Sequence, residues 1–425
     1  MITHPLLTDL ARFGVRLGLT RVRGFLAHLG DPHLDYAVLH VAGTNGKGSV
    51  TRLSGAMLRA QGLRVGEATS PHLQHVNERI VVDGAPIPDA SLDALLTELD
   101  VERRAWAAGG GVDDVDPNVA LTYFEMLTIA ALLYFSRQGV DVAVIEVGLG
   151  GRLDATNVVS STGSAIVSIG LDHTEQLGPD LASIAGEKAG IIKAGVPVVV
   201  GDVAPSALRV IRAAALERGA PLRLAGEDFR LSMERDGSLH YASAELDIRE
   251  LSVGLEGAHQ ARNAAVAVAL VGTLPAPLAP RPEAIRAGLT MARHPGRLEW
   301  LGDDLLVDCA HNDAGAVALA EHLRSLPSDG RRRTLLLGMS ADKDARAVVV
   351  SLAPLVDRVL TTHCAHPRAA SAGDLAAMLV GVSVPVLPAG PVEQALELAS
   401  AGGGLVIAAG SVFLAGAVRD LAGAR

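Results

Sequence analysis

The stretch His40-Val-Ala-Gly-Thr-Asn-Gly-Lys-Gly-Ser-Val50 decides the fold of the first part of this chain. The apolar run Ala37 to Ala42 predicts a buried strand, and a helical pattern extends from about Gly48 to Ala60. Between them, the glycines at 43, 46 and 48 allow backbone amides to approach an anion, and the helix N-terminus adds positive potential. The sequence therefore predicts a phosphate-binding loop between a strand and a helix.

Two side chains of this loop suit nucleotide phosphates. Lys47 can reach the terminal phosphates, and the Ser49 hydroxyl suits a Mg²⁺ ion. The spacing differs from that of the generic P-loop, because two residues rather than four separate Gly43 from Gly46, and Gly48 stands between Lys47 and Ser49. The alternative interpretation is a surface strand-to-helix turn with an incidental lysine.

Length and composition favour two α/β domains. A chain of 425 residues is too long for one ordinary core. A hydrophobic content of 49% with only 3% aromatic residues is typical of parallel sheets covered by helices. We predict a P-loop-containing doubly wound sheet domain over residues 1–295, followed by a smaller Rossmann-like α/β domain over 296–425.

Charge and special segments exclude several classes of protein. The net charge of -10 argues against general nucleic-acid binding, although a local cationic pocket can still hold a phosphate. The chain has only two cysteines, which makes a disulfide framework implausible, and no zinc-binding spacing occurs. No apolar signal core or membrane-spanning run is present, so we expect a cytoplasmic protein that binds no membrane.

Polar residues are expected to gather where strands of the first domain end. Pro71 excludes a smooth helix after the predicted strand Leu63 to Ala68, so Ser70 and His72 lie on an ordered loop. Such a loop lies at the ligand edge of an α/β sheet, although a plain surface loop is an equal alternative. Asp172 and His173 follow a further strand, Ser164 to Ile169, and belong to the same edge, although a single histidine is more often structural.

Glu146 is the one charged residue inside the apolar part of a predicted strand, Asp141 to Val147. Because burying a lone carboxylate costs several kcal/mol, it must be paired or metal-bound, and we expect a metal. The glycine-rich stretch Gly148 to Asn157 follows. The dinucleotide-binding fingerprint G-x-G-x-x-G, started at Gly148, would require glycine at position 153, where this chain has leucine. The mismatch excludes a hydride-transfer enzyme that binds a dinucleotide through this stretch.

Three further residues of the first domain have an ordinary structural explanation beside any role in a site. Glu125 completes a capping box with Thr122 at the start of a helix that continues to Gln138, and capping is its simplest role. Lys188 lies in an apolar helix end, where a lysine more often extends to solvent. Asn263, near the start of a helix that ends at Val271, could cap that helix or contact an adenine edge.

In the second domain, the first strand ends in Asp308-Cys309-Ala310-His311-Asn312, again at the edge of a sheet.

Taken together, seven stretches in order closely resemble the dihydrofolate synthase and folylpolyglutamate synthase family, within the wider group of Mur-type amide ligases. They are Gly43 to Ser49, Ser70 to Leu73, Glu146 to Asn157, Leu171 to Thr174, Glu187 to Gly190, Pro295 to Arg297 and Asp308 to Asn312.

The resemblance implies a role for each of these stretches. Gly43, Thr44, Asn45, Gly46, Lys47, Gly48 and Ser49 would bind ATP with Asn263, Arg297 and Asp308, and His311 would approach the same phosphates. Ser49, Ser70, Glu146 and His173 would hold two Mg²⁺ ions. The pterin would lie near Thr122, Tyr123, Phe124 and Glu125 and near Leu153, Asp154 and Ala155. Lys47, His173, Lys188, Asp308 and His311 would form the catalytic set, and Lys188 matches a position where the family carries a CO₂-derived carbamate.

The reaction that follows from the resemblance activates a substrate carboxylate as an acyl phosphate, with release of ADP. The amine of L-glutamate then displaces phosphate, so no protein nucleophile is needed. The expected partners are therefore small molecules, namely ATP, a pteroate or folate, and L-glutamate, and the expected state is a monomer. Gln176 and the acidic insertion Asp113 to Asp116 depart from common members, and whether the first glutamate, later ones or both are added stays open.

Two rivals are weighed against this interpretation. Peptidoglycan-precursor ligases of the same group carry a nucleotide-sugar domain before the phosphate loop, and only 42 residues precede Gly43 here. A nucleotide-dependent regulatory binding protein would keep the phosphate loop but would not need Asp308 and His311 in a second domain.

Overall fold

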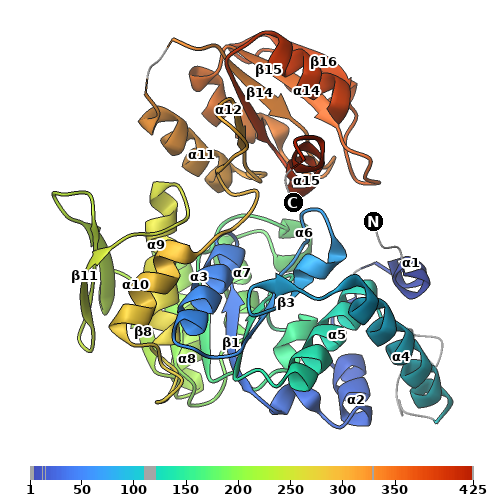
Figure 1. Ribbon diagram of the computed structural model, residues 1–425, viewed down its shortest axis with the longest axis vertical. Helices are drawn as coiled ribbons and strands as arrows, with labels where there is room; N and C mark the ends of the chain where they lie inside the picture. The colour runs from blue at the N-terminus through green and yellow to red at the C-terminus, as the bar shows by residue number, and fades with distance from the viewer. Residues whose placement is uncertain (1–3, 12, 15, 110–120, 328–329, 424–425) are drawn as a thin grey trace. The chain divides into compact units, whose positions relative to one another are not determined.

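A computed structural model describes residues 4–423, except 12, 15, 110–120 and 328–329. The chain divides into two compact units, which Figure 1 shows in blue to yellow and in orange to red. The first unit comprises Met1–Gly254 and Ala261–Ala292, and the second comprises Leu255–Gln260 and Arg293–Arg425. The sequence did not indicate that residues 255–260 would pack with the second unit. The acidic insertion at 113–116 lies outside the described residues.

The described part of the first unit is built on an eight-stranded sheet with the order β4-β3-β2-β5-β1-β6-β7-β8. Six neighbouring strands, β2 to β8 in that order, run parallel, whereas β3 and β4 form an antiparallel edge. The strands are β1 (Ala37–Ala42), β2 (Val65–Ala68), β3 (Ile80–Val82), β4 (Ala85–Pro86), β5 (Val142–Glu146), β6 (Gly163–Ile166), β7 (Val198–Val200) and β8 (Leu222–Leu224). The central strands are buried, which explains why they are continuous apolar runs.

Helices cover this sheet, as a doubly wound fold requires. They are α1 (Pro5–Ala11), α2 (Thr20–His28), α3 (Lys47–Ala60), α4 (Asp89–Ala108), α5 (Tyr123–Gln138), α6 (Thr174–Leu177), α7 (Leu181–Ala189), α8 (Pro205–Glu217), α9 (Ala258–Val271) and α10 (Pro282–Met291). Short 3₁₀ turns are η1 (Pro32–Leu34), η2 (Val76–Arg79) and η3 (Ala155–Val158). Helix α3 packs closely on α10, because a Cβ on Gly288 would lie 2.5 Å from the Met57 backbone nitrogen.

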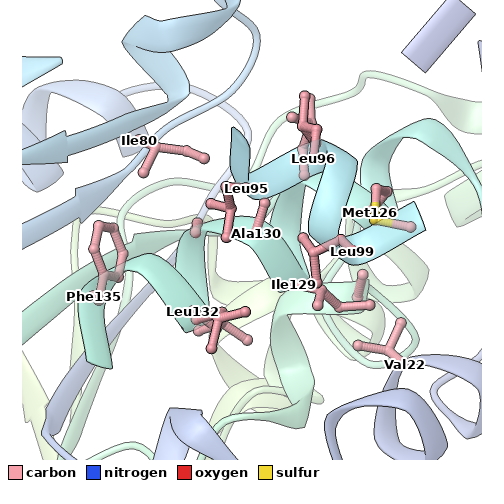
Figure 2. Packing of buried hydrophobic residues seen from close by; sticks show 14 of the residues in the cluster. Val22, Ile80, Leu95, Leu96, Leu99, Met126, Ile129, Ala130, Leu132 and Phe135 are labelled. Atoms are coloured by element: carbon pink, nitrogen blue, oxygen red, sulfur yellow. The ribbon is translucent and has the colours of Figure 1, made fainter. Parts of the chain in front are cut away.

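One large core cluster of the first unit lies around α5. Figure 2 shows Met126 and Ile129 of α5 among Leu96 and Leu99 of α4 and Val22 of α2. All five side chains are fully buried. Because burying a large aliphatic side chain is worth about 1.5 to 3 kcal/mol, this cluster fixes the N-terminal helices against the sheet. The first turn of α5, which carries part of the predicted pterin site, therefore has a rigid support.

A separate three-stranded antiparallel sheet, with the order β11-β10-β9, follows β8 in the described chain. Its strands are β9 (Phe229–Met233), β10 (Leu239–Ser243) and β11 (Asp247–Leu251). Figure 1 shows this small sheet, labelled at β11, at the side of the first unit.

The described part of the second unit holds a six-stranded sheet with the order β12-β13-β17-β14-β15-β16. The strands are β12 (Glu299–Trp300), β13 (Leu305–Val307), β14 (Arg333–Leu337), β15 (Arg358–His363), β16 (Val386–Pro391) and β17 (Leu405–Ala409). The helices are α11 (Asp313–Ser325), α12 (Ala345–Leu352), α13 (Ala372–Met378), α14 (Val392–Ala401) and α15 (Val412–Leu421), with the turn η4 (Ala353–Leu355). Apart from the antiparallel edge strand β12, the sheet is parallel, so the predicted fold class is confirmed for both units.

Candidate active site

Four neighbouring strands place the predicted site segments at one edge of the large sheet. In the order β2-β5-β1-β6, Ala68 is the register partner of Ile145, Val41 of Glu146, and Ala42 of Ile166. Because these strands are parallel, their carboxyl ends meet at the same edge. The Ser70 loop, Glu146, the phosphate loop and the Asp172–His173 segment all follow or end these strands.

The phosphate loop is held in shape by its own neighbours. Lys47 donates from Nζ to the carbonyl oxygens of Gly43 (2.9 Å) and Thr44 (3.2 Å). The Thr44 backbone amide donates to the Ser168 carbonyl (2.9 Å), and the Asn45 amide donates to Ser168 Oγ (2.9 Å). These contacts preorganise the loop, which lowers the cost of ordering it around a phosphate.

Asn263 lies against the same loop, although it comes more than 200 residues later in the chain. Gly46 caps α3 with a φ of 84°, and a Cβ at this position would lie 2.5 Å from Asn263 Oδ1. Ser49, in the first turn of α3, is buried. Asn263 therefore lies beside the phosphate loop, and its contact with an adenine edge stays a prediction.

Glu146 is buried, and one of its oxygens has a backbone partner. The Ser70 amide donates to Glu146 Oε2 at 3.0 Å, so the two predicted metal ligands are neighbours. The Ser70 loop is itself organised by Glu78, whose carboxylate accepts the amides of Leu73 (2.6 Å), Gln74 (2.9 Å) and His75 (2.7 Å). The ordered loop predicted from Pro71 is confirmed.

His173 and Lys188 flank this edge from two other segments. His173 has a left-handed φ of 50°, and its amide donates to Asp172 Oδ1 at 2.8 Å. Lys188, in the last turn of α7, is 4% exposed, so the prediction that such a lysine extends to solvent is wrong here. Burial, together with the charge of Lys47, lowers the pKa of Lys188 to about 7, although Asp172 and Asp154 oppose the shift.

The residues predicted for the pterin come from two segments, 122–125 and 153–155, which have contacts with other loops of the first unit. Phe124 covers Gly148, since a Cβ there would lie 2.8 Å from the Phe124 ring, and the Gly18 amide donates to the Leu153 carbonyl at 3.3 Å. Thr122 and Glu125 form the predicted capping box. Glu125 also accepts a 2.7 Å hydrogen bond from Arg21, which the sequence alone did not pair with it.

Asp154 is buried within its own loop, and burial raises its pKa. Its Oδ2 accepts the Leu149 amide at 2.8 Å, and its Oδ1 accepts the amide (3.0 Å) and hydroxyl (2.5 Å) of Thr156. Thr156 in turn contacts His40 Nε2 at 2.9 Å. Sequence analysis did not identify His40 and Thr156, because their pairing joins positions 116 residues apart.

In the second unit, the predicted residues follow β13. Asp308 accepts the amides of Leu298 (2.9 Å) and Ala310 (2.7 Å), and it is buried. His311 shares a 2.9 Å hydrogen bond between Nδ1 and the Cys309 carbonyl, which fixes the ring. The Leu298 contact therefore holds Arg297, one residue earlier, beside Asp308.

No group of three or more histidine, cysteine, aspartate or glutamate side chains could hold a metal ion in the part of the chain that the structure describes. The four predicted metal ligands include only two such residues, Glu146 and His173, with two serine hydroxyls. This donor set suits a cation that completes its coordination with water and substrate phosphates, as Mg²⁺ does in nucleotide enzymes. The imidazole of His173 is also compatible with Mn²⁺.

Comparison with known proteins finds one matching family model and several relatives that match over most of this chain. Residues 296–412 match the Mur ligase, glutamate ligase domain. The chain is 37% identical to the dihydrofolate synthase/folylpolyglutamate synthase of Mycobacterium tuberculosis over 83% of this chain and 75% of that protein. The chain belongs to the folylpolyglutamate synthase and dihydrofolate synthase family.

Solved structures of this family have the same fold. The Mycobacterium tuberculosis folylpolyglutamate synthase complexed with ADP and AMPPCP matches with a TM-score of 0.89 at 33% identity, over 99% of this chain and 98% of that chain. The Yersinia pestis bifunctional enzyme with Mn, AMPPNP and L-glutamate bound matches with a TM-score of 0.84 at 34% identity, over 98% and 96%.

Another family member is a longer protein. A probable bifunctional folylpolyglutamate synthase/dihydropteroate synthase of Haloferax volcanii is 38% identical over 93% of this chain, which spans about half (47%) of that protein. Among the described helices, none is long and apolar enough to span a membrane.

Proposed function

We propose that this chain is an ATP-dependent ligase that adds L-glutamate to dihydropteroate, to the γ-carboxyl group of folates, or to both, and releases ADP and phosphate. The observation that carries the proposal is the register of β2, β5, β1 and β6, which brings a phosphate loop, a buried carboxylate and a histidine to one sheet edge. Family membership supplies the reaction class.

In this proposal, ATP lies over the loop from Gly43 to Ser49. Lys47 is held by two loop carbonyls, so it can move its ammonium a short way to a phosphate without a large change of the loop. Backbone amides at the start of α3 would bind the phosphates, and Asn263, which packs on Gly46, would contact the nucleotide. Arg297, Asp308 and His311 of the second unit would supply the remaining ATP contacts.

A divalent metal ion fits the donor set of this site. Ser49, Ser70, Glu146 and His173 would hold it, and the Ser70 amide already orients the Glu146 carboxylate. When bound, such an ion would neutralise charge on the transferring phosphoryl group. The family relation supports a divalent metal at this site. We propose that the metal is Mg²⁺ and that two ions bind.

The chemistry needs positioning and charge neutralisation rather than a protein nucleophile. An oxygen of the substrate carboxylate attacks the γ-phosphorus, the bond to the β-phosphate oxygen breaks, and an acyl phosphate and ADP result. The glutamate amine then attacks the acyl carbon, loses a proton, and inorganic phosphate leaves. The pterin end would lie between the start of α5 and the loop from Leu153 to Ala155, which leads into the turn η3 that packs against α5.

Lys188 would carry a carbamate formed with CO₂. Carbamate formation requires a neutral amine, and a lysine with a pKa of about 7 supplies one at physiological pH. The change replaces a cation beside Lys47 with an anion, which removes a repulsion and favours a nearby divalent cation.

A substrate panel tests the proposal. ADP formation is measured with Mg²⁺ and ATP in four mixtures: with glutamate alone, and with glutamate plus dihydropteroate, tetrahydrofolate or tetrahydrofolate diglutamate. We expect ADP formation to require a pterin carboxylate, and the glutamylated product to appear in equal amount. Rapid ATP hydrolysis that no pterin stimulates would contradict a ligase and would favour the regulatory binding protein. The panel also decides between the first glutamate and later ones.

Two further expectations accompany the proposal. A cytoplasmic location and a monomeric state are both predictions from the sequence and from family membership. Light scattering of the purified protein tests the second one directly.

A further inference from the structure

Arg79 ends the turn η2, and its side chain contacts two other segments of the first unit, the loop that carries His72 and the start of α5. Its Nε donates to His72 Nδ1 at 2.9 Å. Its guanidinium carbon lies 5.5 Å from the centroid of the Tyr123 ring, within the range of a cation–π contact. The carboxylates of Glu146 and Glu78 also act on it electrostatically.

The contact with His72 fixes the loop that carries Ser70. Because His72 Nδ1 accepts a hydrogen bond from Arg79, that nitrogen is unprotonated. The base of the loop is closed as well, since the Thr69 amide donates to the Arg79 carbonyl (3.2 Å) and Thr69 Oγ1 donates to the Glu78 carbonyl (3.1 Å). The backbone and the side chain of Arg79 thus both hold the segment from Thr69 to Arg79.

The contact with Tyr123 lies at the other end of the proposed site. Tyr123 is the first residue of α5, directly after the capping residue Thr122, and it is half-buried. Burial lowers the pKa of the Arg79 guanidinium, while the neighbouring Tyr123, Glu146 and Glu78 oppose the shift. An arginine guanidinium stays protonated in proteins, so Arg79 is a cation beside the Tyr123 ring.

We propose that Arg79 is a positioning residue that sets two parts of the site at once: through His72 it orients the Ser70 loop for the metal-bound phosphates, and through the Tyr123 ring it orients the pterin end. This inference rests on the proposed function. The two arms use different chemistry, namely a directed Nε hydrogen bond and a cation over a ring, so they can be separated by substitution.

The test uses two substitutions of Arg79 and one of each partner. Arg79→Lys keeps a cation for the Tyr123 ring but has no Nε in the guanidinium geometry for His72. Arg79→Met removes both arms while keeping an unbranched side chain. His72→Ala removes the loop arm only, and Tyr123→Leu removes the ring arm only. Arg137→Met is the matched control, because that arginine pairs with Glu98 at the exposed end of α5.

Two measurements report on the two arms. Mn²⁺ binding in the presence of AMPPNP, followed by electron paramagnetic resonance, reports on the Ser70 side without turnover. The KM for the pterin substrate reports on the Tyr123 side. We expect Arg79→Lys and His72→Ala to weaken Mn²⁺ binding about tenfold, which corresponds to about 1.4 kcal/mol, with little change in the pterin KM. Tyr123→Leu should raise the pterin KM about tenfold and leave Mn²⁺ binding unchanged, and Arg79→Met should do both.

Equal losses in every variant, or no change in Mn²⁺ binding in Arg79→Met, would overturn the inference. Melting temperatures within a few degrees of the control variant exclude unfolding as the cause. If the unsubstituted protein binds Mn²⁺ with AMPPNP but shows no pterin-dependent turnover, the proposed function fails first. If it turns over normally and the two arms do not separate, only the role of Arg79 fails.

Discussion

The Asn263 side chain occupies the space that a Cβ on Gly46 would need: its Oδ1 lies 2.5 Å from that position. Gly46 also has a φ of 84°, a conformation that L side chains rarely adopt. The phosphate loop therefore accepts only glycine at this point, for a steric and a conformational reason together.

Gly46→Ala should consequently displace Asn263 and deform the loop. Because small misplacements of a phosphate site cost about 10²-fold in rate, we expect kcat/KM for ATP to fall at least that much. Gly62→Ala is a matched control, since its φ is 91° but nothing lies within 4 Å of the new Cβ. The control should lose some stability and keep its activity. Equal activity losses in both variants would mean that backbone strain, not the contact with Asn263, is responsible.

Lys47→Ala removes the cation of the phosphate loop. Preorganised charges that stabilise a transferring group are typically worth about 10² to 10³ in turnover, so we expect kcat to fall by about that factor or more. The fold should persist, because Lys47 lies in the first turn of α3 and its Nζ donates to the carbonyl oxygens of Gly43 and Thr44 within the loop. Steady-state kinetics with a circular dichroism spectrum check both statements. A loss of less than fivefold would show that Lys47 does not act on the phosphates.

His40 should make the protein less stable in mild acid. It is fully buried, and burial lowers its pKa to about 3, whereas the unfolded chain protonates near the usual 6.5. Between these values the unfolded state binds one more proton, so stability rises with pH and is lost as pH falls through this window. The contribution is about 1.4 kcal/mol per pH unit. Urea unfolding of the native protein and of His40→Gln should differ by this slope, and parallel curves would contradict the assignment.

The sequence could predict what depends on local pattern. Glu146 stood out because it is a carboxylate at the end of an apolar strand, and the capping pair Thr122 and Glu125 followed from a spacing of three residues. The central strands β1 and β5 were recognised as continuous apolar runs. In contrast, β16 (Val386–Pro391) was missed, because two prolines and a glycine in six residues are atypical of a strand, and its edge position tolerates them.

Pairings between distant positions could not be predicted. Arg21 and Glu125 are separated by 104 residues, and His40 and Thr156 by 116. Arginine and histidine side chains carry no periodic signal that identifies a partner, so only the fold reveals these contacts. The same holds for Lys188 in α7, whose repulsion by Lys47 requires the end of this helix to lie close to the phosphate loop.

Lys188 gives the last prediction, which concerns both CO₂ and pH. Burial and the charge of Lys47 lower its pKa to about 7, so the neutral amine that reacts with CO₂ is the major form above pH 7 and becomes scarce below it. We expect glutamate ligation to be slow in CO₂-depleted buffer, to recover on addition of bicarbonate, and to lose activity as pH falls through about 7. Because the unfolded lysine titrates near 10.5, the native state binds fewer protons between about 7 and 10.5, so this group should make stability rise with pH across that range.

Lys188→Ala should abolish ligation, keep AMPPNP binding, and lose the bicarbonate response, while a short carboxylic acid should restore part of the activity. A carbon-13 spectrum of active enzyme in labelled bicarbonate that shows no carbamate signal would contradict the modification, and the lysine would then act as a cation on the phosphates.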